Sequence, residues 1–150
     1  MPLHHSSNSG GIKSNAPFLG ASPDGIVTYT NSGKTETGVL EVECPASEKW
    51  KALSTEECAK DVDFYCDLDT ETGLCWLKPS HKYYFQVQGQ MGLTGINRCD
   101  FVVWTPGRIS VESIMFCEEY WDGMFQKLKN FCQNVFLIEL FCRRVMRGLT

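Results

Sequence analysis

Alternating apolar and polar positions predict two short strands near the start of the chain. The segments are GIVTYT at 25–30 and GVLEVEC at 38–44, and the Asn, Ser and Gly residues between them are typical of a hairpin-like loop. Pro45 ends the second strand, because proline has no N–H to donate to a neighbouring strand. We therefore expect the two strands to pair with each other.

The middle of the chain predicts two helices. Residues 46–59 mix Lys, Glu, Ala and Leu, which favours a short helix, and we expect the acidic stretch that follows, up to residue 73, to be an exposed excursion. The pattern at 81–95 allows a helix or a strand. The spacing of Tyr84, Val87 and Met91 and the glycines that follow favour the helix.

The last third predicts two more strands and a helix. The run CDFVVWTP at 99–106 is almost entirely apolar, which is typical of a central strand covered on both faces, and 108–116 alternates as its neighbour would. From residue 118, early acids, later lysines and an apolar stripe predict an amphipathic helix. This order of elements indicates an α/β sheet with helices packed against it.

Size and composition are those of a single folded domain. The chain has 150 residues, of which 43% are hydrophobic, so it can bury one core. The longest apolar run, NVFLIELFC, is too short to cross a bilayer, and the polar N-terminus is unlike a secretory signal. We expect a partly disordered tail at 1–17, a domain at 18–145, no membrane partner, and an intracellular location, nuclear or cytoplasmic.

The eight cysteines and the net charge limit the choice of function. No Cys-x-x-Cys pair is present, so we expect reduced thiols, and a zinc-stabilised interaction domain is a weaker alternative. The formal net charge of -4 argues against a uniformly basic nucleic-acid binder. It leaves room for a local basic groove, and for a nuclease whose metal site needs clustered carboxylates.

Three acids are candidates for such a site. Glu41 and Glu43 are two residues apart on a predicted strand and so share one face, although an ordinary half-buried strand also alternates in this way. Asp24 lies in a Ser-Pro-Asp-Gly turn just before the first strand, where plain turn chemistry is the alternative. If the hairpin brings Asp24 beside Glu41, the three carboxylates form a hard-oxygen site suited to Mg²⁺ or Mn²⁺.

Four motifs in order resemble a known nuclease family. FLGASPDGIV, GVLEVECP, HKYYFQVQGQM and CDFVVWTP resemble the lambda-exonuclease-like, YqaJ-type viral recombinase nucleases of the PD-(D/E)xK superfamily, over about residues 10–131. The resemblance implies a restriction-endonuclease-like core, with a mixed central β-sheet flanked by helices. It implies a metal-dependent deoxyribonuclease of the exonuclease type, acting on duplex DNA ends in viral or transposon recombination. A homo-oligomer and a recombination partner protein are further expectations.

The resemblance also implies roles for individual residues. Asp24 and Glu41 match the carboxylates that bind the catalytic magnesium, together with the backbone carbonyl of Val42. Gln86 matches the glutamine of the family's Tyr-x-x-Gln motif on the helix beside the site. The expected substrate contacts are Ser22, Tyr83, Gln88 and Gln90. For the three glutamines, a solvated helix face is the alternative.

Glu43 departs from the family pattern, which has a lysine at this position. That lysine orients the attacking water and offsets transition-state charge, so a glutamate here reverses the expected charge. Three outcomes are open: Glu43 is a further metal ligand or general base, a second metal replaces the positive charge, or the site has decayed. The last outcome leaves a catalytically inactive DNA-binding or protein-interaction module on the same fold. The N-terminal helices of the family are also expected to be missing or altered.

Overall fold

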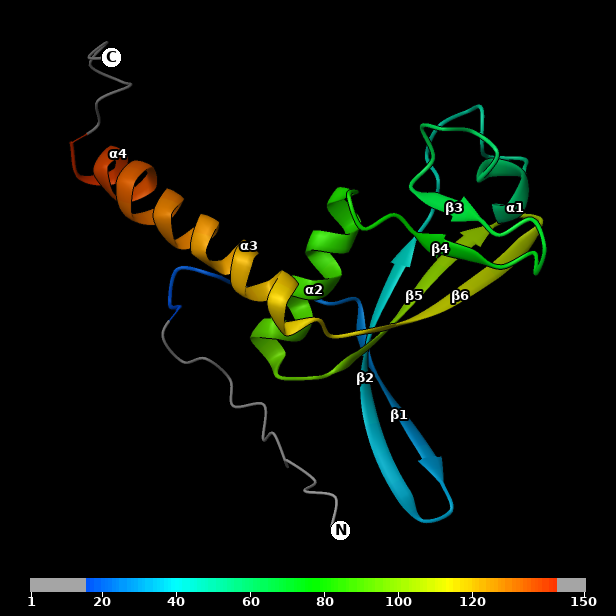
Figure 1. Cartoon of the computed structure of the whole chain (residues 1–150), viewed down its shortest axis with the longest axis horizontal. Coiled ribbons are helices and arrows are strands. Elements are labelled where there is room, and N and C mark those ends of the chain that lie inside the picture. Colours follow the sequence, from blue (N-terminus) through cyan, green and yellow to red (C-terminus); the bar gives the residue numbers. More distant parts are fainter. Residues whose placement is uncertain (1–15, 143–150) are drawn as a thin grey trace, which may run out of the picture.

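A computed structural model describes residues 16–142 of the chain (Figure 1). The strands are β1 (Gly25–Asn31), β2 (Lys34–Glu43), β3 (Cys66–Leu68), β4 (Cys75–Leu77), β5 (Arg98–Thr105) and β6 (Arg108–Met115). The helices are α1 (Thr55–Cys58), α2 (Lys82–Thr94), α3 (Glu118–Phe131) and α4 (Leu137–Cys142), with a π-helical segment, η1 (Cys132–Phe136), before α4. The predicted tail at 1–17 lies almost wholly outside the described residues, as do residues 143–145 of the predicted domain.

Four strands form one mixed sheet in the order β1-β2-β5-β6. β2 and β5 are parallel, whereas β1 pairs with β2, and β5 with β6, in the antiparallel sense. Parallel neighbours need a long crossover, which here contains α2. Figure 1 shows α2 lying against the sheet with α3 beyond it. The predicted α/β class, with a mixed sheet and helices against it, is therefore confirmed, and β5 is a central strand as predicted.

The first hairpin is longer and tighter than predicted. Its strands stay paired as far as Asn31 and Lys34, so most of the predicted loop between residues 30 and 38 is strand. Ser32 and Gly33 turn the chain with φ values of 49° and 78°, as a two-residue type I′ turn requires. The sequence signal was missed because Lys34–Thr37 are exposed on both faces and carry no apolar alternation.

The segment after β2 also differs from the prediction. Of residues 46–59 only α1 is helical, closed by a capping box in which Ser54 and Glu57 bond each other's backbone N–H groups. The acidic stretch that follows is not an exposed excursion, because Phe64, Tyr65 and Cys66 are buried in the core. Three consecutive apolar residues outweigh the acids around them, and they lead into the small β3–β4 hairpin.

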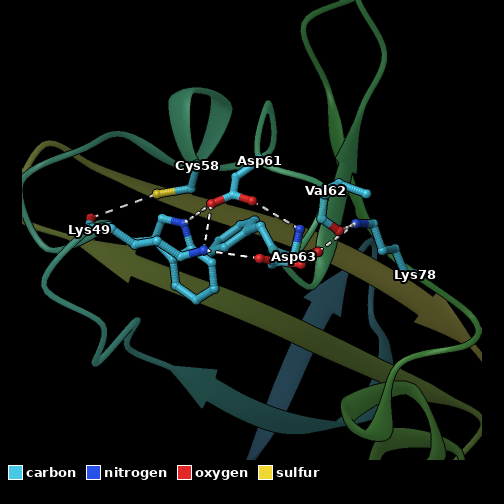
Figure 2. Close-up of polar contacts among 8 residues, drawn as sticks. Lys49, Cys58, Asp61, Val62, Asp63 and Lys78 are labelled. Carbon is cyan, nitrogen blue, oxygen red and sulfur yellow. Dashed lines mark hydrogen bonds and ion pairs between the residues drawn. The ribbon is translucent and has the colours of Figure 1, made fainter.

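Polar contacts hold this segment in place (Figure 2). Asp61 accepts from the ammonium group of Lys49 at 2.8 Å and from the indole Nε1 of Trp50 at 3.1 Å. The Lys49 ammonium is the main cause that lowers the pKa of Asp61 to about 2. Lys78 donates to the carbonyl oxygen of Phe64 at 2.6 Å. These charges serve to anchor a loop to the core.

The two faces of the central sheet differ in burial. On the face toward α2, alternate side chains of β5 are buried: Cys99, Phe101, Val103 and Thr105. On the opposite face, Trp104 is 46% exposed, and Ile109 and Val111 of β6 are also exposed. The prediction that β5 is covered on both faces is therefore wrong for the described residues. An apolar run cannot show on its own which of its faces other elements cover.

The C-terminal helices extend away from the sheet as one continuous run (Figure 1). α3 begins with Glu118 and Glu119 as predicted, and it packs against α2 through the buried side chain of Trp121. Within the described residues, no helix is both long and apolar enough to cross a membrane.

The cysteines of the described residues are free thiols, several of them buried. All eight lie in the described part of the chain, and none is joined to another by a disulfide. Cys99 and Cys132 are buried as small apolar groups, and burial raises the pKa of the Cys99 thiol to about 12.

The packing of α2 on α3 leads to a stability prediction. A Cβ atom at Gly92 would lie 2.5 Å from Cδ2 of the Trp121 ring, so the ring or the helix would have to shift. We expect Gly92→Ala to lower the free energy of unfolding by about 1–3 kcal/mol through overpacking. Gly89→Ala is the matched control, because its nearest contact is Cε of Met124 at 3.5 Å. It should be neutral or stabilising by up to about 1 kcal/mol.

Urea denaturation of both variants, followed by circular dichroism, measures the two effects. Equal stability of the two variants would contradict the close packing of α2 on α3.

Candidate functional site

The first hairpin brings Asp24 to the end of β2. Gly25 pairs with Leu40, so Asp24 lies just beyond the paired region, next to Glu41. The Oδ2 atom of Asp24 accepts a hydrogen bond from the backbone N–H of Val42 at 2.8 Å. The structure thus fixes the Ser-Pro-Asp-Gly turn to β2 and places two of the candidate metal ligands side by side.

Glu41 is a buried carboxylate held by two amides. Its side chain is 4% exposed and points to the face of the sheet on which α2 lies. The Nε2 atom of Gln86 donates to Oε1, and the Nε2 atom of Gln90 donates to Oε2 at 2.8 Å. Burial raises the pKa of Glu41, and the charge of Asp24 adds to this rise. Among residues 16–142, Glu41 has no cationic partner within ion-pair distance.

The glutamines predicted to contact substrate occupy different positions. Gln90 is buried, and its Oε1 atom has no hydrogen-bond partner among the described residues. Gln88 is fully buried on another side of α2, where it donates to the carbonyl of Met115 at 3.0 Å and accepts from the N–H of Cys117 at 2.9 Å. Gln88 therefore ties α2 to the junction of β6 and α3. This placement argues against a contact between Gln88 and a substrate.

Glu43 lies at the end of β2 beside the start of α2. Its carboxylate forms a hydrogen bond with the hydroxyl of Tyr83, whose ring packs edge-on against Tyr65 with centroids 5.1 Å apart. Burial raises the pKa of Glu43, and repulsion from Glu41 adds to this rise. Burial and the bond to Glu43 raise the pKa of Tyr83 to about 12. Tyr83 is therefore a neutral hydrogen-bond partner for Glu43.

A cavity of about 390 Å³ adjoins this group of residues. Ser22 lines it from the Ser-Pro-Asp-Gly turn, and Gln86 and Gln90 line it from α2. Its other walls are apolar and include Phe85 and Trp121. Ser22 thus lines the same cavity as the two glutamines that contact Glu41.

The donor set fits a small hard cation. The carboxylates of Asp24 and Glu41 with the backbone carbonyl of Val42 are oxygen ligands, and magnesium typically takes one or two carboxylates and keeps several waters. A buried carboxylate without a cationic partner also favours the binding of a cation. In the part of the chain that the structure describes, no three or more His, Cys, Asp or Glu side chains are arranged to hold a metal ion. The predicted three-carboxylate cluster that includes Glu43 is therefore not formed.

Sequence reasoning missed Lys82 as a charged residue of this region. Lys82, Gln86 and Gln90 recur every four residues and therefore share one side of α2. The pattern K-x-x-x-Q-x-x-x-Q was present in the sequence and could have indicated this shared side.

Comparisons with known proteins bear on the family and the fold of this chain. The YqaJ-like viral recombinase domain matches residues 4–97, a segment that contains Asp24, Glu41 and Gln86. No curated protein matches the chain. A solved structure described as "Crystal Structure of LHK-Exo in complex with dAMP" is similar, with a TM-score of 0.50 and 21% identity over 75% of this chain and 50% of that one. The chain thus spans half the length of that structure, and the similarity confirms the predicted restriction-endonuclease-like fold.

Another acid on the same face of the sheet lies outside this site. Glu41 of β2, Phe101 of β5 and Glu112 of β6 are neighbours in one row across the sheet. The Oε2 atom of Glu112 accepts from the backbone N–H of Leu77 in β4 at 2.6 Å. Burial raises the pKa of Glu112, although the bond from Leu77 partly offsets the rise. Glu112 thus joins the β3–β4 hairpin to the central sheet.

The raised pKa of Glu112 leads to a pH-dependence prediction. Because the folded protein holds this proton more tightly than the unfolded chain, Glu112 lowers stability as the pH rises from its ordinary pKa of 4.5 through its native pKa. In Glu112→Gln this contribution is absent, and the amide oxygen can still accept from Leu77. We expect the stability of the variant relative to the native protein to increase between pH 4 and pH 7.

Urea denaturation of both proteins across this pH range measures the difference. A difference that stays constant with pH would contradict a raised native pKa for Glu112.

Proposed function

This chain belongs to the YqaJ-like viral recombinase domain family, and on that basis we propose that it is a metal-dependent deoxyribonuclease of the exonuclease type, acting on duplex DNA ends. The observation that carries the proposal is the convergence of Asp24 and the buried Glu41 beside two glutamines of α2. The similar solved structure was obtained with dAMP, a deoxynucleotide, which agrees with a nucleic-acid substrate.

Asp24, Glu41 and the backbone carbonyl of Val42 would hold Mg²⁺ or Mn²⁺. When bound, such an ion supplies a water of lowered pKa and stabilises the charge that develops on the scissile phosphate. The chain's own part is to position these ligands. Gln90 fixes one oxygen of Glu41, and the N–H of Val42 fixes one oxygen of Asp24. These contacts hold the carboxylates in place before a cation arrives.

The substrate would meet the polar groups that line the cavity. The hydroxyl of Ser22 and the amide of Gln86 can both donate hydrogen bonds and line the same cavity, and Gln86 also contacts Glu41. Phosphate oxygens are acceptors and suit these donors. We propose DNA as the partner, while a homo-oligomer and a recombination partner protein are expected from the family resemblance alone.

A cleavage assay tests this function. End-labelled linear duplex DNA should be degraded with Mg²⁺ or Mn²⁺ and remain intact with EDTA, and a closed circular duplex should resist an enzyme that needs ends. We expect Asp24→Asn and Glu41→Gln to lower the cleavage rate about 100- to 1,000-fold or more, the scale of losing one transition-state-stabilising group. Glu112→Gln is the matched control, because this acid shares the face of the sheet but bonds Leu77 instead.

Absence of cleavage by the folded protein with either metal would contradict the catalytic proposal. Cleavage of the closed circle would keep the nuclease but exclude a strict requirement for ends.

One observation favours a second candidate, a DNA-binding module without catalytic activity. Glu43 places a third negative charge near Asp24 and Glu41, at the position where the family has a lysine. This charge opposes the approach of a phosphate. The module would bind duplex DNA without metal and without turnover.

The two candidates differ in the effect of Glu43→Lys. If the native protein is inactive, restoring the lysine should produce metal-dependent cleavage, while Glu43→Gln, which only removes the charge, should produce little. If the native protein is active, Glu43→Lys should change the rate by less than the loss expected for Asp24→Asn. Gel analysis of labelled duplex, with anisotropy measurements of binding in EDTA, separates the cases.

A further inference from the structure

The side chains of α2 lie in step with the acids of β2. Gln90 and Gln86 contact the two oxygens of Glu41, and Lys82 lies one further helical turn toward the start of α2. Four residues of helix advance about 6 Å, and two residues of strand advance about 6.6 Å. Lys82, one turn before Gln86 on α2, is therefore level with Glu43, two residues after Glu41 on β2. The matched spacing places Lys82 beside the end of β2.

Contacts at the start of α2 agree with this register. Tyr83 forms a hydrogen bond with Glu43, which fixes the first turn of the helix next to that carboxylate. The Nζ atom of Lys82 lies 5.3 Å from the centroid of the Tyr83 ring. The positive charge of Lys82 acts on the carboxylate of Glu43, so the two side chains are near each other.

The charge of Lys82 is available to a ligand. The residue is exposed, and it forms no ion pair within 4 Å with any residue in the described range. A lysine in the first turn of a helix is also disfavoured by the helix dipole, by about 0.3–1 kcal/mol. Helix stability therefore does not account for a lysine at this position.

We propose that Lys82 supplies, from α2, the positive charge at the scissile phosphate that position 43 of β2 lacks. The inference rests on the proposed nuclease function and names a residue of that same site. The flexible four-carbon stem of lysine can bring its ammonium group to a phosphate from the helix as well as from the strand. Glu43 keeps its bond to Tyr83 and holds the helix start in place.

A double-mutant cycle tests the proposal. In the native background, Lys82→Ala should lower the rate of duplex cleavage about 100-fold or more, and Lys82→Arg should retain most of it. In a Glu43→Lys background the strand provides the charge, so Lys82→Ala should cost less than about tenfold. Lys34→Ala, at the other end of β2, is the control and should leave both rates unchanged. Equal losses in the two backgrounds would overturn the proposal.

A binding measurement gives a result that does not need turnover. With Ca²⁺ in place of Mg²⁺, duplex affinity is measured by fluorescence anisotropy over a series of KCl concentrations. Loss of one phosphate contact should reduce the slope of log affinity against log salt by about 0.9 for Lys82→Ala, and not for Lys34→Ala. If the native protein cuts no DNA, the proposed function fails while this slope still decides the role of Lys82. An unchanged slope would overturn that role.

Discussion

The burial of Glu41 against α2 is the interaction on which the site depends. A carboxylate taken out of water needs partners, and here both of its oxygens accept from glutamine amides of one helix. That requirement fixes the rotation and register of α2 on the sheet. The parallel pairing of β2 with β5 requires the crossover that contains α2. The tight hairpin between β1 and β2 brings Asp24 next to Glu41, where it accepts from the N–H of Val42. Hydrogen bonds from β2 and α2 thus hold Asp24 and Glu41 next to each other.

The same face of the sheet carries a second buried acid with a different task. Phe101 of β5 lies between Glu41 of β2 and Glu112 of β6 in one row across the sheet. The two acids are therefore on strands that are not neighbours. The carboxylate of Glu112 accepts a hydrogen bond from the backbone of β4. The carboxylate of Glu41 accepts from side-chain amides, which leaves it able to bind a cation as well. Burial and a raised pKa therefore do not identify a functional acid by themselves. The partners of each acid distinguish the two roles.

Local patterns predicted much of this arrangement, and long-range contacts account for the rest. The turn with Asp24, the strand with Glu41 and the helix with Gln86 follow from short-range signals in the sequence. Of the segment 46–59, for which a short helix was predicted, only Thr55–Cys58 is helical. Trp50 and Leu53 of that segment pack against the core, and Lys49 pairs with Asp61, and the sequence pattern does not reveal such contacts. Residues two apart on a helix lie on different sides, so the sequence could have separated Gln88 from Gln86.

The charge reversal at position 43 has a different meaning once its neighbours are known. Glu43 joins no metal-binding cluster of three or more such side chains in the described residues, and its carboxylate bonds Tyr83. That bond holds the first turn of α2, the turn from which Lys82 projects. What matters for charge on a phosphate is where the cation lies, not which element carries it. On our proposal, therefore, the glutamate on β2 and the lysine on α2 form one coupled arrangement, in which the acid positions the helix that supplies the cation.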